Sequence, residues 1–392
     1  AASDVYKRQV IIMRIVFWQN CLSPHQLPYI VHLLEDERVD EVVVCAGEAI
    51  NRTRKDMGWD TTSYPGLENC DVYLVPTPQT VEHLMQVRTE DSYHLFSGIR
   101  GFAFVFDAFL RSLAYPLKRG MITERPNTYA YGRANGKPLW LHRLRWKLQD
   151  RKFMPKVNCV FAMGTDASDF YRTLHEGWKV FPFGYCTEGH QIERKPDGST
   201  MITHPLRVAY VGGLSWRKSV DTLLISTIIT QKMSPGNEIE LTLIGDGPER
   251  AKLEAIVNKN QLNNVRFLGS QKQSEIPRLL AYHDVLVLPS IYDGWGAVVN
   301  EGLQAGLFTI CSDACGAKDL LHDPRCGAVF RTGDVKQLTK VLSYCRDHVE
   351  SIRGDKQYRM DWADKAISGK AVARYMVDCL CNVKTERPWI QE

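Results

Sequence analysis

The sequence predicts an α/β protein with two domains, each built on a doubly wound parallel sheet. The chain has 392 residues, and single domains commonly take about 100–200 residues. Strand-like runs alternate with helix-like runs, which is the pattern of a parallel sheet covered by helices. The alternation stops once, over the polar residues 189–204, which contain Pro196 and Gly198. We interpret this stretch as an interdomain linker.

The first domain is expected to span residues 13–188. Ser23 is expected to cap a helix over 29–34, with Pro24 in its first position and Gln26 completing a capping box. Strands are expected at 14–18, 41–45, 72–75, 94–96, 120–123 and 159–162.

The second domain is expected to span residues 205–374. Its predicted strands are 207–211, 240–244, 265–268, 285–288 and 309–311. Its predicted helices are 220–230, 248–258, 275–281, 298–305 and 334–346. Ligands of open α/β sheets bind beyond the carboxyl ends of the strands, so two such domains facing each other predict a cleft.

Composition excludes several classes of protein. Hydrophobic residues make up 44% and charged residues 24%, which is ordinary globular usage rather than that of a disordered or fibrous chain. A net charge of +4 is too balanced for a dedicated nucleic-acid-binding protein, so we expect no nucleic-acid partner. The 11 cysteines are scattered without paired CxxC spacing, which favours reduced thiols over disulfides or a zinc site.

The sequence also predicts where the protein is found. No run approaches the roughly 18 apolar residues that span a bilayer, and no secretory signal is visible. Residues 1–9 are polar and lead into no element, whereas Met13 reads as a native start, so we exclude the leader from the fold. We therefore expect a cytoplasmic protein without a metal ion.

The strongest candidate site follows the predicted strand 285–288. Asp293 lies on a glycine-punctuated loop and Glu301 lies about one turn inside the next helix. Gly294 and Gly296 allow close approach of a ligand, and the free N–H groups of Ala297 and Val298 suit an anion. A carboxylate here is suited to accept hydrogen bonds from a ribose diol. The alternative is a loop with two solvated carboxylates.

Two further turns end strands of the same domain. Gly212 and Gly213 precede the adjacent cations Arg217 and Lys218, an arrangement that suits a diphosphate. The predicted strand 265–268 ends at Gly269 and Ser270. Taken singly, each turn is equally well explained by simple turn chemistry.

Together, in this order, the turns resemble those of the family 4 retaining glycosyltransferases of the GT-B fold, with two Rossmann-like domains. The resemblance covers residues 13–345 and is strongest over 207–334. It implies that Glu301 binds the nucleotide ribose, Asp293 the donor-sugar hydroxyls and Lys218 the diphosphate. It also implies that Gly269 and Ser270 line the base pocket, and that residues 375–392 pack back on the first domain, with Trp389 as an anchor.

The resemblance implies transfer of a sugar, with retained configuration, from a UDP- or GDP-linked donor to a glycan or lipid-linked acceptor. The family usually has an arginine where this chain has Gly213, and Arg217 is expected to supply that charge. The first acid is usually glutamate and here is Asp293. Lys218, Arg217 and the amides at 297–298 would stabilise the leaving diphosphate without a metal or other cofactor.

The acceptor side is less specific. His25, His94, Ser97 and Glu124 sit at predicted strand ends and are candidates to face the cleft, although capping, turn or surface roles explain each of them as well. In the basic segment 137–156, Leu141, Leu144 and Leu148 recur at helical spacing among seven cations. This pattern fits an anionic membrane surface, hence a peripheral position at the inner face of the plasma membrane, or a surface helix with its leucines in the core.

The leading hypothesis is a glycosyltransferase of cell-surface polysaccharide synthesis. A GT-B-fold sugar-nucleotide epimerase would bind the same nucleotides without an acceptor. A degenerate, inactive homologue, or a two-domain sugar-binding protein with a hinge, would catalyse no transfer.

Overall fold

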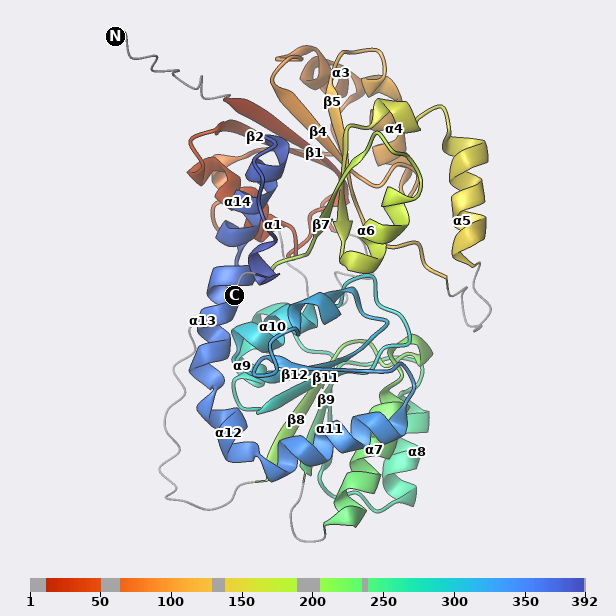
Figure 1. The fold of residues 1–392 in the computed structure, drawn as a ribbon, viewed down its shortest axis with the longest axis vertical. Coiled ribbons are helices and arrows are strands. Elements are labelled where there is room, and N and C mark those ends of the chain that lie inside the picture. Colours follow the sequence, from red (N-terminus) through yellow and green to blue (C-terminus); the bar gives the residue numbers. More distant parts are fainter. Residues whose placement is uncertain (1–11, 51–63, 129–137, 189–204, 235–238, 391–392) are drawn as a thin grey trace, which may run out of the picture.

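The computed structural model describes residues 12–50, 64–128, 138–188, 205–234 and 239–390. It contains a seven-stranded and a six-stranded sheet, and every strand pair within them is parallel. Figure 1 shows the two units one above the other, with the chain returning along one side. The predicted α/β architecture with two parallel sheets is confirmed.

The first sheet has the order β3-β2-β1-β4-β5-β6-β7. Its strands are β1 (Met13–Cys21), β2 (Val39–Glu48), β3 (Asp71–Leu74), β4 (Ser92–Ser97), β5 (Lys118–Thr123), β6 (Cys159–Met163) and β7 (Lys179–Phe183). Its helices are α1 (Leu27–His32), α3 (Pro78–Gln86), α4 (Ala103–Ser112), α5 (Leu139–Arg145) and α6 (Thr165–Arg172).

The second sheet has the order β10-β9-β8-β11-β12-β13. Its strands are β8 (Leu206–Val211), β9 (Ile239–Ile244), β10 (Val265–Gly269), β11 (Val285–Leu288), β12 (Phe308–Ser312) and β13 (Gly327–Phe330). Its helices are α7 (Val220–Met233), α8 (Arg250–Lys259), α9 (Ile276–Leu280), α10 (Val298–Gln304) and α11 (Val335–Asp347).

Both sheets reverse their strand order at one point, between β1 and β4 and between β8 and β11. Crevices beyond the carboxyl ends of the strands form at such points, because neighbouring connections leave on opposite faces of the sheet. Each sheet is therefore expected to have a crevice at the point where its strand order reverses.

The chain then crosses back to the first unit through α12 (Val349–Gly354), α13 (Lys356–Ile367) and α14 (Gly369–Leu380). α14 packs against α1, and the Tyr375 hydroxyl donates to the carbonyl of Pro182 at 2.9 Å. Trp389 is buried and its ring centroid lies 5.9 Å from that of Tyr375. The boundary expected at residue 375 falls inside α14.

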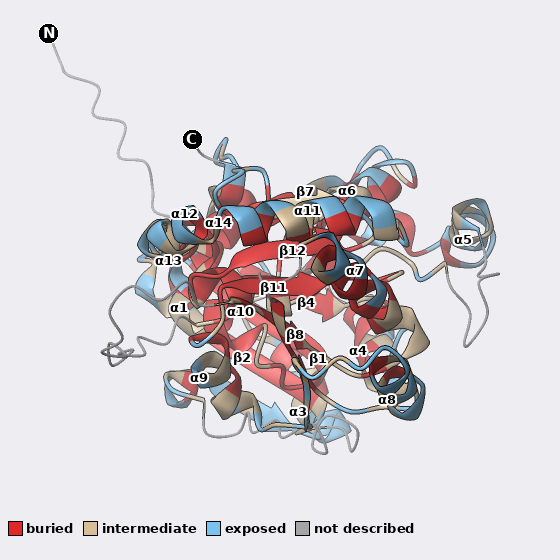
Figure 2. Cartoon of the chain, turned by 90° about the horizontal axis from the view of Figure 1, so that it is seen from below, coloured by how far each residue is buried: buried red, intermediate tan, exposed pale blue. Residues whose placement is uncertain are grey.

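The strands form the buried interior of each unit, and exposed residues lie on the outward faces of α7, α8 and α11 (Figure 2). One apolar cluster continues from the first sheet into the second and includes Tyr29, Trp295 and Val285. The units therefore share a core.

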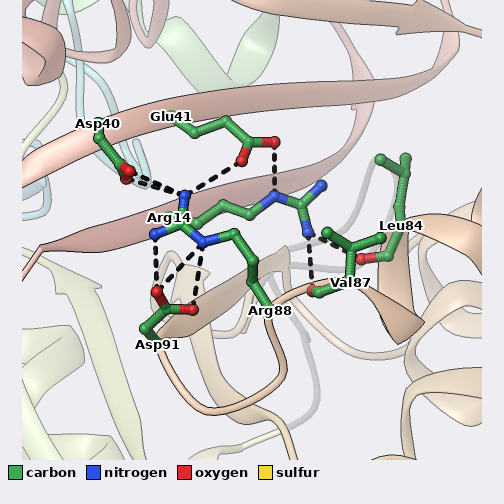
Figure 3. Close-up of polar contacts among 7 residues, drawn as sticks. All are labelled: Arg14, Asp40, Glu41, Leu84, Val87, Arg88 and Asp91. Atoms are coloured by element: carbon green, nitrogen blue, oxygen red, sulfur yellow. Dashed lines mark hydrogen bonds and ion pairs between the residues drawn. The ribbon is translucent and has the colours of Figure 1, made fainter.

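A charged network holds the amino end of the first sheet (Figure 3). Arg14 is 1% exposed, donates to Glu41 at 2.7 Å and also donates to two carbonyls at the carboxyl end of α3. Beside it, Arg88 bridges the carboxylates of Asp40 and Asp91. Because this end is opposite the crevice, the network stabilises the sheet and leaves the crevice to other residues.

Local differences from the expected elements have simple causes. The first helix begins at Leu27 rather than near Pro24, because the amides of Gln26 and Leu27 both donate to the carbonyl of Ser23 and form a turn there. The prediction that Ser23 caps the helix is wrong, since the helix has no side-chain cap. Strands β7 and β13 were not expected; Pro182 fits β7 because that strand lies at the sheet edge. The predicted leader and linker lie outside the described residues.

Candidate functional site

Three glycine-containing turns meet at the carboxyl edge of the second sheet. The amide of Gly212, after β8, donates to the carbonyl of Ile244, and the amide of Gly245 donates to the carbonyl of Gly269. A Cβ at Gly245 would overlap the carbonyl of Gly212, and Gly245 has a φ of +134°. Side chains are absent where backbone meets backbone, which leaves polar main-chain groups at the edge.

A charged contact joins the loops after β8 and β11. Lys218 Nζ lies 2.5 Å from Asp293 Oδ2, and Arg217 Nη1 lies 3.7 Å from the same oxygen. Arg217 also donates to the carbonyl of Tyr292 at 2.7 Å, and its own carbonyl accepts from the amide of Ile291. Two cations and a carboxylate are therefore held at the reversal point of the sheet, where the sequence placed three of the four expected catalytic residues.

Glu301 occupies a different part of this edge. It lies on α10 and its Oε1 accepts from Gln273 Nε2 at 2.7 Å. Loss of hydration raises the pKa of Glu301 to about 7, and the hydrogen bond from Gln273 opposes the shift. Such a carboxyl changes its charge near neutral pH and has a free oxygen for a further donor.

The remaining expected residues follow the same edge. Gly269 ends β10 with a φ of +68°, and Ser270 after it is exposed. Gly296 has a φ of +95°, and Ala297 and Val298 begin α10. A Cβ at Gly213 would meet nothing nearer than the carbonyl of Asp246 at 3.8 Å. The expected ligand-binding roles of these residues stay predictions.

The first unit covers the Asp293 loop. The Tyr292 hydroxyl donates to the carbonyl of Arg125 at 2.7 Å, and the carboxylate of Glu124 lies directly against Gly294. Lys318 of the second unit lies 2.9 Å from Asp166 of α6. The two units therefore meet on the loop that carries Asp293.

Two cavities adjoin this contact. One, of about 490 Å³, is the crevice at the reversal point of the first sheet, and Ser97, Glu124 and Tyr185 contribute to its lining. The other, of about 1270 Å³, lies between the units and is lined in part by His25, Gln273 and Glu301. Three of the four candidate acceptor-side residues thus border a cavity.

His94 does not. It lies within β4, is 0% exposed, and accepts from Trp18 Nε1 through Nδ1 at 3.1 Å. Burial lowers the pKa of His94 to about 3. The expectation that His94 faces the cleft is wrong, because β4 begins two residues before it, at Ser92, and its side chain is buried against Trp18.

The basic segment forms α5, a π-helical turn η3 (Trp146–Asp150) and a 3₁₀ turn η4 (Met154–Lys156). Trp140, Leu144 and Leu148 are 59%, 43% and 73% exposed. The alternative that these leucines fill the core is wrong for Leu144 and Leu148. Figure 1 shows α5 at the outer edge of the first unit. Residue 137 lies outside the described residues.

Among the residues that the structure describes, no group of three His, Cys, Asp or Glu side chains is arranged to hold a metal ion. Within the same ranges, no helix combines the length and the apolar character needed to cross a bilayer.

The sequence did not identify Gln273 or Tyr185. Gln273 holds Glu301, and the Tyr185 hydroxyl donates to Glu124 Oε1 at 3.2 Å. Polar residues follow Gly269 in the sequence, but a glutamine in a loop carries no signal of its partner. Tyr185 follows the edge strand β7, and only folding brings it next to Glu124, which lies 61 positions earlier in the chain.

Comparison with known proteins places the second unit. Residues 192–351 match the family model of glycosyl transferases group 1. The chain is 25% identical over 197 residues to a GDP-mannose-dependent alpha-mannosyltransferase of Mycobacterium tuberculosis strain CDC 1551 / Oshkosh. That match covers 50% of this chain and 47% of the relative, so the chain spans about half the length of the curated protein it matches.

Solved structures extend the likeness to both units. HepE of Anabaena, in complex with UDP, aligns with a TM-score of 0.66 and 15% identity over 94% of this chain and 100% of its own. The lipopolysaccharide outer core galactosyltransferase WaaB aligns with a TM-score of 0.63 and 14% identity over 94% of this chain and 99% of its own. At these identities the likeness concerns the fold. The chain therefore has the GT-B fold, and its residues 192–351 match the model of glycosyl transferases group 1.

Proposed function

We propose that the chain is a retaining, metal-independent glycosyltransferase that uses a UDP- or GDP-linked sugar. The observation that carries the proposal is the contact of Lys218 and Arg217 with Asp293 at the reversal point of the second sheet. Cations fixed there suit a diphosphate, and the carboxylate beside them suits the hydroxyls of the attached sugar. HepE, which has this fold, was solved with UDP.

In this assignment Lys218 and Arg217 hold the diphosphate, and Asp293 keeps both cations in place before the donor arrives. Glu301 accepts from the ribose hydroxyls, since this residue borders the large cavity. Gly269 and Ser270 line the base pocket. Gly212, Gly213, Gly296, Ala297 and Val298 let the donor approach the backbone.

The reaction breaks the bond between the anomeric carbon and the diphosphate oxygen. A bond from the acceptor oxygen to that carbon forms on the same face, and the acceptor proton leaves with the diphosphate. Lys218 and Arg217 stabilise the charge that develops on the departing group. No cofactor and no metal take part.

The acceptor is a glycan or a lipid-linked sugar of cell-surface polysaccharide synthesis, handled in the cytoplasm at the inner face of the plasma membrane. Exposed Leu144 and Leu148 lie beside exposed cations such as Lys147 and Arg151. Apolar side chains beside cations suit an anionic bilayer, and each cation near such a surface adds about 1 kcal/mol. His142 and Arg145 of the same segment line the smaller cavity, so an acceptor in that crevice could remain attached to the bilayer.

A thermal-shift panel tests the donor site. UDP, GDP, ADP and their sugar conjugates are added in EDTA to the native chain and to Glu301→Ala. A ligand at about 100 times its dissociation constant stabilises the fold by about 2.7 kcal/mol. We expect one nucleotide series to raise the Tm of the native chain and to act weakly on the variant. If no nucleotide raises the Tm, the inactive homologue is the better description.

Product analysis separates the two enzymes. A transferase forms a glycoside with retained configuration from octyl glycosides, whereas an epimerase converts one sugar nucleotide into another without an acceptor.

Sedimentation with vesicles tests the membrane surface. Phosphatidylglycerol vesicles should bind the native chain, phosphatidylcholine vesicles should not, and Leu144→Ser with Leu148→Ser should weaken binding. Equal binding to both vesicle types would contradict the proposal that the cations of this segment attract an anionic bilayer.

A further inference from the structure

Glu124 reaches from the first unit into the loop of Asp293. It follows directly after β5, at the carboxyl edge of the first sheet, and is half-buried. Its carbonyl accepts from the Tyr171 hydroxyl at 3.2 Å, and its Oε1 accepts from the Tyr185 hydroxyl at 3.2 Å. The backbone and one carboxylate oxygen are thus fixed by two tyrosines.

The other carboxylate oxygen lies in space that a side chain at position 294 would need. A Cβ built at Gly294 would overlap Oε2 of Glu124 and lie 3.0 Å from its Cγ. Gly294 directly follows Asp293, whose Oδ2 contacts Lys218. Glycine at 294 therefore lets a carboxylate of the first unit stand beside the sugar-binding loop of the second.

Glu124 also borders the crevice of about 490 Å³ in the first sheet. Its lining includes neutral polar side chains: Asn20, Ser97, Thr123 and Tyr185 carry amides or hydroxyls. The described charged residues that line it besides Glu124 are Arg100 and Asp150, which pair with each other, and Arg145, whose Nε donates to Gln149. Glu124 thus stands where this crevice meets the Asp293 loop, with Tyr185 donating to one of its oxygens.

We infer that Glu124 binds the attacking hydroxyl of the acceptor, and that the crevice selects an uncharged, polyhydroxylated sugar at that position. This inference rests on the proposed function. A hydroxyl in the crevice that attacks a sugar held at Asp293 would lie beside the Glu124 carboxylate, which borders the crevice and contacts Gly294. The carboxylate accepts the hydrogen bond and orients the oxygen, and the proton still leaves with the diphosphate. An acidic group on the acceptor at this position would be repelled.

Kinetics with octyl glucoside and octyl galactoside test the role. UDP-glucose, UDP-galactose and GDP-mannose serve as donors, and the best pair is carried forward. We expect Glu124→Gln to raise the acceptor KM about tenfold and to lower kcat, since a hydrogen bond to a charged group is lost. Nucleotide affinity and transfer to water should stay within about twofold. Tyr185→Phe should have a smaller effect in the same direction.

Glu176→Gln is the matched control, because Glu176 is an exposed carboxylate near the amino end of β7, at the opposite edge of the sheet. It should leave all parameters unchanged. An unchanged acceptor KM and kcat in Glu124→Gln would overturn the inference, as would an equal loss of transfer to water. If the native chain turns over none of the donors and shows no nucleotide-dependent Tm, the proposed function fails instead.

A double-mutant cycle tests the placement without catalysis. Gly294→Ala should lower the Tm, because its methyl group meets the Glu124 carboxylate. Glu124→Ala should recover part of that loss, since neighbouring substitutions that share a contact are not additive. Strictly additive shifts would contradict the contact between Glu124 and Gly294, and with it the inference.

Discussion

The two sheets share a strand order apart from the additional strand β7, but the side chains at their carboxyl edges differ in chemistry. Beyond β8 and β11, Lys218, Arg217 and Asp293 meet in one contact. Beyond β4 and β5 the crevice has several hydroxyls and amides, and the Glu124 carboxylate reaches Gly294 of the other unit. The strand order places a crevice, but the side chains at the strand ends decide its ligand. A diphosphate suits the second edge and a neutral sugar hydroxyl suits the first.

The largest effect is expected at the charged contact of the second edge. Lys218→Ala should lower the rate of sugar transfer by about 10²–10³-fold, because it removes a group that stabilises the leaving diphosphate. Steady-state transfer with the best donor measures this. Lys252→Ala is the control, since Lys252 is an exposed lysine on α8 that pairs with Glu249. Equal activity of the two variants would remove the distinction between the edges.

The amino end of the first sheet should affect stability alone. Arg14→Leu removes the donors to Glu41 and to two carbonyls of α3. The free energy of unfolding should fall by about 2–3 kcal/mol, because these acceptors lose a buried partner. Urea denaturation gives the value, and nucleotide affinity below the transition should not change. A loss of affinity would mean that the two ends of the molecule are coupled.

Glu301 should trade stability for binding. Its pKa of about 7 in the fold lies above the ordinary value, so the folded chain loses stability as pH rises between 4.5 and 7. Glu301→Gln should therefore raise the free energy of unfolding by about 1–3 kcal/mol at pH 8 and have no effect below pH 4.5.

The same substitution sharpens the donor assignment. The carboxylate accepts from ribose better than the acid does, so affinity for a sugar nucleotide should increase as pH rises from 6 to 8. Glu301→Gln should weaken binding and remove this increase. Calorimetric titration measures both. Persistence of the pH dependence in the variant would exclude Glu301 as its source.

The smallest effect is a gain at the second edge. A Cβ at Gly213 has room, with its nearest neighbour at 3.8 Å. Gly213→Arg should strengthen nucleotide binding about tenfold by adding a third cation near Lys218. The increase should shrink at high salt. Gly247→Arg is the contrast, because a Cβ at Gly247 would overlap the carbonyl of Leu214 and should destabilise the fold.

The sequence predicted the elements that have local signals. The run 285–288 was placed without error as β11, because a short apolar stretch bounded by turn residues has few alternatives. β7 was missed because Pro182 argues against a strand unless the strand is known to be at an edge. The contact of Lys218 with Asp293 joins residues 75 positions apart, so the motif predicted the partners and only folding brought them together.

The acceptor side could not be predicted in the same way. His94 and Glu124 looked alike as polar residues at predicted strand ends. One proved to be inside its strand beside Trp18 and the other lies against Gly294. The difference is that β4 begins at Ser92, two residues before its predicted start at His94, and sequence patterns do not resolve strand ends to this precision.

The described end of the first unit touches the helix that returns to it from the second. Gly369 begins the helix that returns to the first unit, and a Cβ there would lie 2.5 Å from Oε1 of Glu188, the last described residue before the second unit. Two rigid units that are joined along one side can rotate about that side but cannot slide past each other. If the units separate, we expect a rotation about the contact of Glu188 with Gly369. Such a rotation moves residues near its axis least, so Glu124 and Gly294 would separate while Glu188 stays in contact with Gly369.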